Sequence, residues 1–235
     1  MLRISETVKA LLIINVIVFV GAMSMQETAT RLFALFYFDN PSFEFWQPVT
    51  SMFMHGGITH IAFNMIGLWM FGTPLEQRWG TKKFLFFYFS AGLGAALVHM
   101  GANYIELQMA FQEIMAAGFT QDHIDLALNT GKVFVDFPDA FEPYYRPAVG
   151  ASGAVYGIMV AFALYHPNAK LALIFFPVPV AAKYFVPVLL IAATIFGVSG
   201  TAGGIAHWAH IGGAVFGFLM AWSWRKSGNN LNRWN

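Results

Sequence analysis

One serine stands between glycines at the start of an apolar stretch, in Gly150-Ala151-Ser152-Gly153. Glycine at positions 150 and 153 lets backbone or a neighbouring helix come close to the serine hydroxyl. Backbone N–H groups at the start of a helix have no partner within the helix, and they can stabilise a developing negative charge. Ser152 is therefore a candidate nucleophile. The alternative is a patch of small residues for helix packing, because Gly153 and Gly157 have the G-x-x-x-G spacing that is common in membrane helices.

A histidine with suitable neighbours lies near the C-terminal end. His210, Gly213 and Gly217 share one helical face, because offsets of three and seven residues return to the same side of a helix. A histidine on a glycine-lined face can approach a partner helix closely enough to form a hydrogen bond, and Ser152 is the expected partner. We choose His210 over His207 as the base, because the glycines continue the stripe of His210.

A second polar pair lies in an earlier apolar stretch. His60 and Asn64 are four residues apart and share a helical face, with Gly67 close to the same face. Taken alone, the pair can equally be a hydrogen-bonded contact that holds two membrane helices together.

Metal chemistry is a further possibility, because four histidines could gather: His55, His60, His207 and His210. The chain has no H-E-x-x-H pattern and no cysteine, and the cores of its apolar segments lack Asp and Glu. We therefore expect no metal and no cofactor.

Composition identifies the medium in which these residues act. Of 235 residues, 57% are hydrophobic and 11% are charged, whereas a soluble domain has about 25% charged residues. This balance predicts an integral membrane protein with a single domain over residues 1–235. The formal net charge of +1, with no run of Lys and Arg, gives no argument for nucleic-acid binding.

The apolar segments predict an all-α, polytopic bundle of six transmembrane helices. Three prolines, Pro167, Pro177 and Pro179, argue against a continuous helix over 167–182. The six expected spans are 8–24, 58–76, 84–103, 152–165, 183–199 and 205–224.

The distribution of basic residues predicts the orientation. If both termini are cytoplasmic, ten of the thirteen Lys and Arg residues fall on the cytoplasmic side, as the positive-inside rule requires. Residues 25–57 are rich in aromatic side chains, and we expect them to form a loop in the membrane interface. Residues 104–147 form an acidic outer insertion, which we expect to be a solvated loop with an amphipathic helix over 104–118.

Together these residues resemble a rhomboid intramembrane serine protease. The resemblance covers most of the chain, and its ordered set of motifs is specific. These are Trp46, the run Thr50 to His60, Asn64, Gly72-x-x-x-Glu76-x-x-x-Gly80 with Arg78 inside it, Gly150-Ala151-Ser152-Gly153 with Tyr156, and Ala209-His210-Ile211-Gly212-Gly213 with Gly217.

The resemblance implies a role for each position. Ser152 would be the nucleophile and His210 its general base. His60 and Asn64, with the backbone N–H of Ser152, would form the oxyanion hole. Tyr156 would stack against the ring of His210, and Gly150 would allow the tight turn into the fourth span. Residues 25–57 would be the membrane-embedded first loop, and the fifth span with residues 199–204 would be the gate and cap for substrates.

The resemblance also implies partners and a location. The substrates would be transmembrane proteins in a lipid bilayer, cut where a helix is weak, and we expect a multi-pass protein of a bacterial inner membrane. One departure is Gln47, which follows Trp46 where the family often has arginine. Two other functions stay open: a catalytically silent rhomboid-like protein that binds membrane clients, and a transporter, which would need charged residues in mid-membrane.

Overall fold

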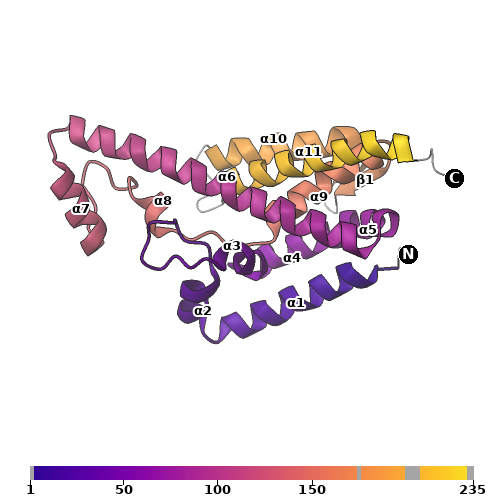
Figure 1. Ribbon diagram of the computed structural model, residues 1–235, viewed down its shortest axis with the longest axis horizontal. Coiled ribbons are helices and arrows are strands. Elements are labelled where there is room, and N and C mark those ends of the chain that lie inside the picture. The colour runs from indigo at the N-terminus through magenta and orange to yellow at the C-terminus, as the bar shows by residue number, and fades with distance from the viewer. Residues whose placement is uncertain (1–2, 174–175, 199–206, 232–235) are drawn as a thin grey trace.

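The computed structural model describes residues 3–173, 176–198 and 207–231. Most of them are helical, in a bundle with one hairpin (Figure 1). The helices are α1 Glu6–Met23, α2 Gln26–Phe33, α3 Gln47–Thr50, α4 Ile58–Gly67, α5 Thr73–Trp79, α6 Thr81–Ala116, α7 Gln121–Thr130, α8 Glu142–Tyr145, α9 Ser152–Tyr165, α10 Ala182–Val198 and α11 His207–Leu231. Two short helical turns, η1 Ser51–Phe53 and η2 Leu68–Gly72, precede α4 and α5.

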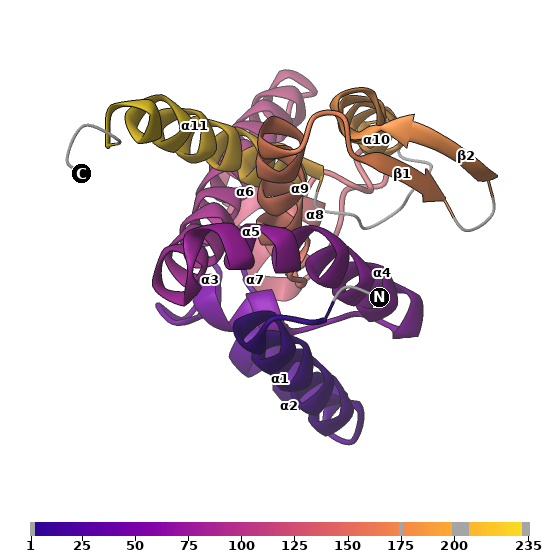
Figure 2. The same ribbon diagram turned by 90° about the vertical axis from the view of Figure 1, so that its right-hand side faces the viewer.

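Helix α9 occupies the centre of the bundle. It packs against α6, α10 and α11 and against the end of α4 (Figure 2). Its side chains are small or apolar and mostly buried, including Ala154, Ile158 and Ala161. A helix that is apolar all round is stable only inside a protein or a membrane, so Ser152 stands at the first residue of a helix that is mostly buried.

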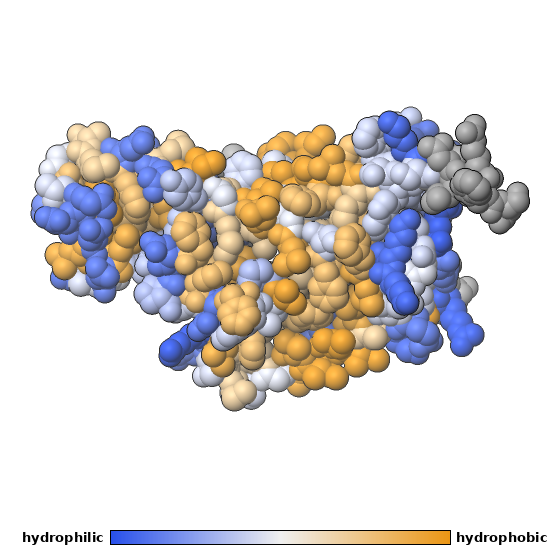
Figure 3. Space-filling view, viewed as in Figure 1, coloured by the Kyte–Doolittle hydropathy of each residue, from blue (hydrophilic) through white to orange (hydrophobic). Residues whose placement is uncertain are grey.

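On the face shown in Figure 3, the middle of the bundle is mostly apolar, hydrophilic residues gather at the right-hand end, and the left-hand end is mixed. Large exposed side chains in the middle belong to several helices, among them Ile17 of α1, Leu97 of α6 and Val188 of α10. Among the described helices, α1 and α6 are long and apolar enough to cross a bilayer by themselves. Helix α1 begins, and α11 ends, at the end of the bundle opposite α7 and α8 (Figure 1).

The expected second span is an interrupted helix. Helix α4 continues through the wide turn η2, which is a π-helix, into α5. Pro74 lies at the start of α5. Proline has no N–H and clashes with the carbonyl four residues earlier, so a regular α-helix cannot run through this point.

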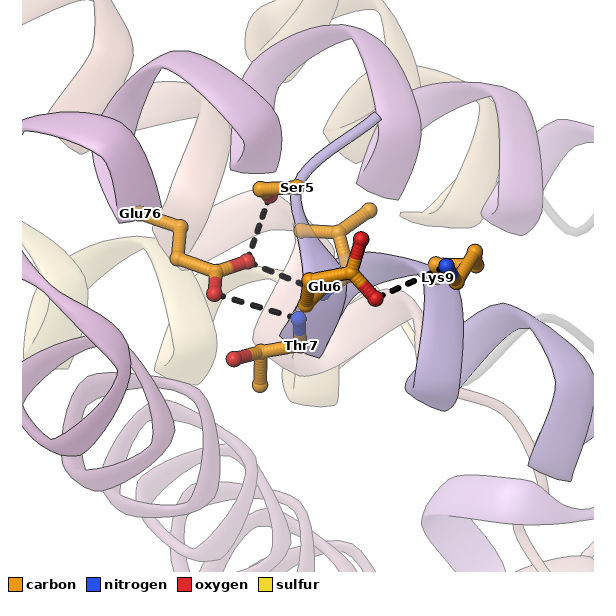
Figure 4. A network of polar contacts seen from close by, with 6 residues as sticks. Ser5, Glu6, Thr7, Lys9 and Glu76 are labelled. Atoms are coloured by element: carbon orange, nitrogen blue, oxygen red, sulfur yellow. Dashed lines mark hydrogen bonds and ion pairs between the residues drawn. The ribbon is translucent and has the colours of Figure 1, made fainter. Parts of the chain in front are cut away.

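The carboxylate of Glu76, on α5, caps α1. It accepts hydrogen bonds from the backbone N–H groups of Thr7 (3.1 Å) and Val8 (3.0 Å) and from the hydroxyl of Ser5 (Figure 4). These N–H groups have no partner within the helix, and a negative charge at a helix N-terminus is favourable. Glu76 therefore joins α1 to α5, the helix that continues from α4.

The expected third span, 84–103, is too short. Helix α6 continues without a break to Ala116, and Gly118, with φ of +96°, ends it. The N–H groups of Gly118 and Phe119 bond to the carbonyls of Met115 and Ile114, as in a Schellman cap. The helix expected over 104–118 is therefore the outer part of α6, because no residue near position 103 stops a helix.

The expectation of a solvated loop over 104–147 is wrong in part. The C-terminal part of α6, together with α7 and α8, encloses a small core of its own, against Tyr37 of the first loop. Its buried members are Tyr37, Leu107, Ile114, Ile124, Ala127 and Phe141. Apolar residues at helical spacing on α6 and α7 bury one another here. The segment contains many acidic residues between them, so its overall composition did not predict a core.

No continuous helix runs over the described residues between α9 and α10, as the prolines predicted. Residues 170–173 (β1) and 176–181 (β2) form an antiparallel hairpin, with Lys170 opposite Ala181. Residues two apart in a strand direct their N–H groups to the same side, so Pro177 and Pro179 are compatible with a strand edge that pairs with no further strand among the described residues.

Candidate active site

The side chains of Ser152 and His210 are in direct contact. His210 Nε2 lies 2.8 Å from Ser152 Oγ, within hydrogen-bond distance. The two residues come from the start of α9 and from α11, and 58 positions separate them in the chain. A serine hydroxyl next to a neutral imidazole nitrogen is the arrangement in which histidine can accept the serine proton.

Glycines bring the two helices together. A Cβ atom on Gly213 would lie 1.9 Å from the carbonyl oxygen of Gly153, and one on Gly217 would lie 2.4 Å from Cα of Gly157. Real side chains cannot occupy such positions, so Gly213 and Gly217 are needed for the approach of α11 to α9. On α9, a Cβ on Gly153 would lie 2.4 Å from Cβ of Ala95 in α6. The packing role of the G-x-x-x-G spacing and the placing of Ser152 beside His210 are thus two consequences of one contact.

The ring of His210 is held from one side by Tyr156. The two rings are stacked, with centroids 4.3 Å apart and planes inclined by 5°. Tyr156 lies four residues after Ser152, on the same face of α9. One helix therefore carries both the hydroxyl that contacts His210 and the flat surface on which the ring of His210 stacks.

Gly150 leaves the space in which His60 approaches Ser152. Its φ of +128° is rarely adopted by residues with a side chain, and a Cβ there would lie 2.8 Å from His60 Nε2. Its N–H donates to the carbonyl of Ser51 (2.9 Å), and Leu35 and Ala148 form a β-bridge just before it. The first loop therefore holds the turn that leads into α9.

The imidazole of His60 is oriented as a hydrogen-bond donor to this space. Its Nδ1 accepts the N–H of Gly56 (3.3 Å), so in the neutral ring the proton is on Nε2, the atom next to Gly150. Asn64 is buried, and its amide donates to the carbonyl of His60 (3.0 Å). One N–H of that amide is thus used within α4, and the second is left for another acceptor.

His55 supports His60, a role that the sequence analysis missed. Its ring contacts the ring of His60 edge-on, with centroids 5.1 Å apart, and its Nδ1 lies 3.3 Å from the carbonyl of Phe53. Burial, and secondly the nearby His60, lower the pKa of His55 to about 4, so its ring is neutral at pH 7. The clue in the sequence was its place five residues before His60, across a flexible Gly-Gly pair.

A comparison with protein families decides what kind of protein carries this site. The family model described as the Rhomboid domain matches residues 42–227, which is most of the chain. The chain belongs to the rhomboid family. The expected resemblance is therefore confirmed, and the chain is a membrane protein.

Individual rhomboid relatives are distant. The chain is 31% identical over 180 residues to RHOMBOID-like protein 12, mitochondrial, of Arabidopsis thaliana, covering 77% of this chain and 46% of that protein. It is 29% identical over 216 residues to Rhomboid protease AarA of Providencia stuartii, covering 87% of this chain and 65% of that protein. It is 28% identical over 180 residues to Rhomboid protease GluP of Bacillus subtilis, covering 76% of this chain and 26% of that protein. The chain thus spans about two thirds or less of the length of each of these relatives.

Gln47, the departure from the family pattern, organises the first loop of this rhomboid. Its side chain is fully buried, accepts the N–H of Phe36 (3.2 Å), and donates to the carbonyls of Arg31 (3.2 Å) and Ser42 (2.7 Å). An amide both donates and accepts, so it can join three backbone groups. This role was not predicted from the sequence, because its partners lie up to 16 residues away.

The remaining expectations concern metal ligands and the gate. Within the described part of the chain, no three His, Asp or Glu side chains are arranged to hold a metal ion. The ring of His207 lies against that of Trp208, with centroids 5.3 Å apart. Residues 199–204, expected to form the cap over the site, lie outside the described residues.

Proposed function

We propose that this rhomboid is an intramembrane serine endopeptidase that uses a Ser152–His210 dyad. The observation that carries the proposal is the 2.8 Å contact between His210 Nε2 and Ser152 Oγ in a member of a family that includes named proteases. The mechanism needs no cofactor and no metal.

In the first step, Ser152 Oγ attacks the carbonyl carbon of the scissile peptide while His210 Nε2 takes the hydroxyl proton. The peptide carbonyl becomes a negatively charged oxygen. Donors already aimed at this oxygen stabilise it more in a poorly hydrated site than in bulk water. The available donors are the backbone N–H of Ser152, Nε2–H of His60 and the second amide N–H of Asn64.

In the second step, His210 gives its proton to the leaving amine, and the C–N bond breaks. Water then attacks the acyl-serine, and His210 acts again as base. A cavity of about 40 Å³ borders Ser152, Gly150 and His99. A water molecule needs about 10–15 Å³ of such space, so the cavity is large enough to supply water to the ester.

The proposed substrates are transmembrane segments of other proteins. A peptide bond in a helix has its carbonyl already hydrogen-bonded, so the segment must unwind before it is cut. An apolar cavity of about 310 Å³ between α10 and α11 borders Tyr156 and His210. Its apolar lining supports access by such segments from the bilayer.

The proposal includes six spans with both termini cytoplasmic and the site near the outer side. We also keep residues 1–235 as one domain, with 25–57 as its membrane-embedded first loop. Named relatives come from both mitochondria and bacteria, so family membership does not favour the proposed bacterial inner membrane over a mitochondrial one.

The test is cleavage of a membrane-protein substrate by the purified protein in detergent or liposomes. A panel of transmembrane substrates with small residues near the outer membrane boundary should be cut by the wild type and not by Ser152→Ala. Cleavage should persist in strong chelators. If neither protein cuts the panel, and the wild type is not labelled by a fluorophosphonate probe, the chain is a silent client-binding rhomboid.

A further inference from the structure

Three polar residues occupy one face of the outer part of α6. His99, Asn103 and Glu106 are spaced by four and three residues, so they lie on the same side of the helix. The amide of Asn103 donates to the carbonyl of Pro143 in α8 (3.2 Å). Glu106 accepts a hydrogen bond from Nε1 of Trp208 in α11 (2.7 Å). This face therefore connects the acidic insertion with the helix that carries His210.

We propose that Glu106 is a positioning residue for the general base, acting through Trp208. The inference rests on the proposed protease function. It gives the insertion a role: the outer part of α6 supports the segment of α11 that precedes His210. Helices α6 and α11 run side by side over this region (Figure 1).

The position of His210 is determined by contacts on both sides of it along α11. After it, Gly213 meets the backbone of Gly153, and a Cβ on Gly212 would lie 2.6 Å from Cβ of Val98. Before it, Trp208 is tied to Glu106. Loss of that tie removes one of the contacts that hold α11 before His210, while the glycine contacts after it persist.

The bond is suited to positioning. A carboxylate acceptor makes a short, charge-assisted hydrogen bond that is about twice as strong as a neutral one. The carboxylate itself stands on a rigid base, because Asn103 is held by Pro143 and the adjacent Leu107 is buried in the small core of the insertion. Glu113, two turns further along α6, is exposed like Glu106, but its side chain makes no hydrogen bond within the described part of the chain.

The expected consequence is kinetic. A displacement of about 1 Å in a catalytic group can lower the rate by about 10²-fold. Removing the acceptor should therefore lower kcat by about tenfold and leave KM unchanged, because Glu106 lies outside the substrate path between α10 and α11.

The test compares Glu106→Ala, Glu106→Gln and Trp208→Phe with the control Glu113→Ala, in the full-length protein. We would measure kcat and KM with a cleaved substrate, the rate of fluorophosphonate labelling of Ser152, and the melting temperature. Glu106→Ala and Trp208→Phe should each slow cleavage and labelling about tenfold, and the double variant should be no slower than either. Glu106→Gln keeps an acceptor oxygen and should retain at least half of the activity, and Glu113→Ala should match the wild type.

The outcomes separate this inference from the proposed function. If the wild type does not cleave or label, the protease proposal fails. If the wild type is active and Glu106→Ala equals Glu113→Ala, the positioning role is wrong. It is equally wrong if Glu106→Ala lowers only the melting temperature, or if Glu106→Gln is as slow as Glu106→Ala.

Discussion

The imidazole of His210 lies parallel to the phenol ring of Tyr156, with centroids 4.3 Å apart. Within the described part of the chain, Nδ1 of His210 has no hydrogen-bond partner. In the proposed mechanism, this stacking would take the place of the carboxylate that orients histidine in many serine proteases. A flat apolar surface restricts rotation of the ring without changing its charge.

Two substitutions of Tyr156 should distinguish the contribution of its ring to activity from that of its hydroxyl. Tyr156→Phe keeps the stacked surface and should retain most of the activity, whereas Tyr156→Ala frees the ring of His210 and should lower kcat by about 10²-fold. Steady-state cleavage with the melting temperature as control checks this. Full activity in Tyr156→Ala would mean that the stacking does not orient the base.

The choice between His207 and His210 can be tested with a fluorophosphonate probe. Ser152→Ala and His210→Ala should each abolish cleavage and labelling, and the double variant should be no worse, because members of one catalytic unit are non-additive. His207→Ala should keep substantial activity, since it leaves the contact between His210 Nε2 and Ser152 Oγ in place. If His207→Ala lost all cleavage while His210→Ala still cleaved, His207 and not His210 would be the base.

Asn64→Ala removes one candidate donor to the oxyanion. Loss of such a donor typically lowers kcat by about 10² to 10³-fold. The amide of Asn64 also donates a hydrogen bond to the carbonyl of His60, so the melting temperature of the variant must be measured as well as its kcat. An unchanged kcat would show that Asn64 only packs.

Two glycine substitutions should differ in their effect on stability. A methyl group at Gly213 would overlap the carbonyl of Gly153, whereas one at Gly21 in α1 has no atom within 4 Å. Gly213→Ala should destabilise the protein by about 1–3 kcal/mol or more, as overpacking does. Gly21→Ala should be neutral or stabilising by up to about 1 kcal/mol. Unfolding in detergent would measure both, and equal stability would contradict the close contact.

The proposed orientation of the chain in the membrane can be tested by introducing single cysteines, because the natural chain contains no cysteine. A membrane-impermeant thiol reagent on intact cells should label Asp125→Cys, in α7 of the insertion, and spare Asn235→Cys. The reverse pattern would place the insertion and the site on the cytoplasmic side.

Much of this protein follows from local features of its sequence. Apolar length and charge depletion predict membrane helices, and α9 begins and ends at the predicted residues because glycines and a proline bound its apolar run. The stripe of His210, Gly213 and Gly217 predicts a close helix contact, since helical periodicity alone places these residues on one face.

Other features depended on the tertiary structure. The bonds of Gln47, the cap of Glu76 on α1 and the contact of Glu106 with Trp208 join residues 16, 68 and 102 positions apart. Periodicity shows which residues share a face, but it cannot show which other face they meet. That is decided by how whole helices pack, where the small clearances at Gly153 and Gly213 determine the position of α11 and so which histidine reaches Ser152.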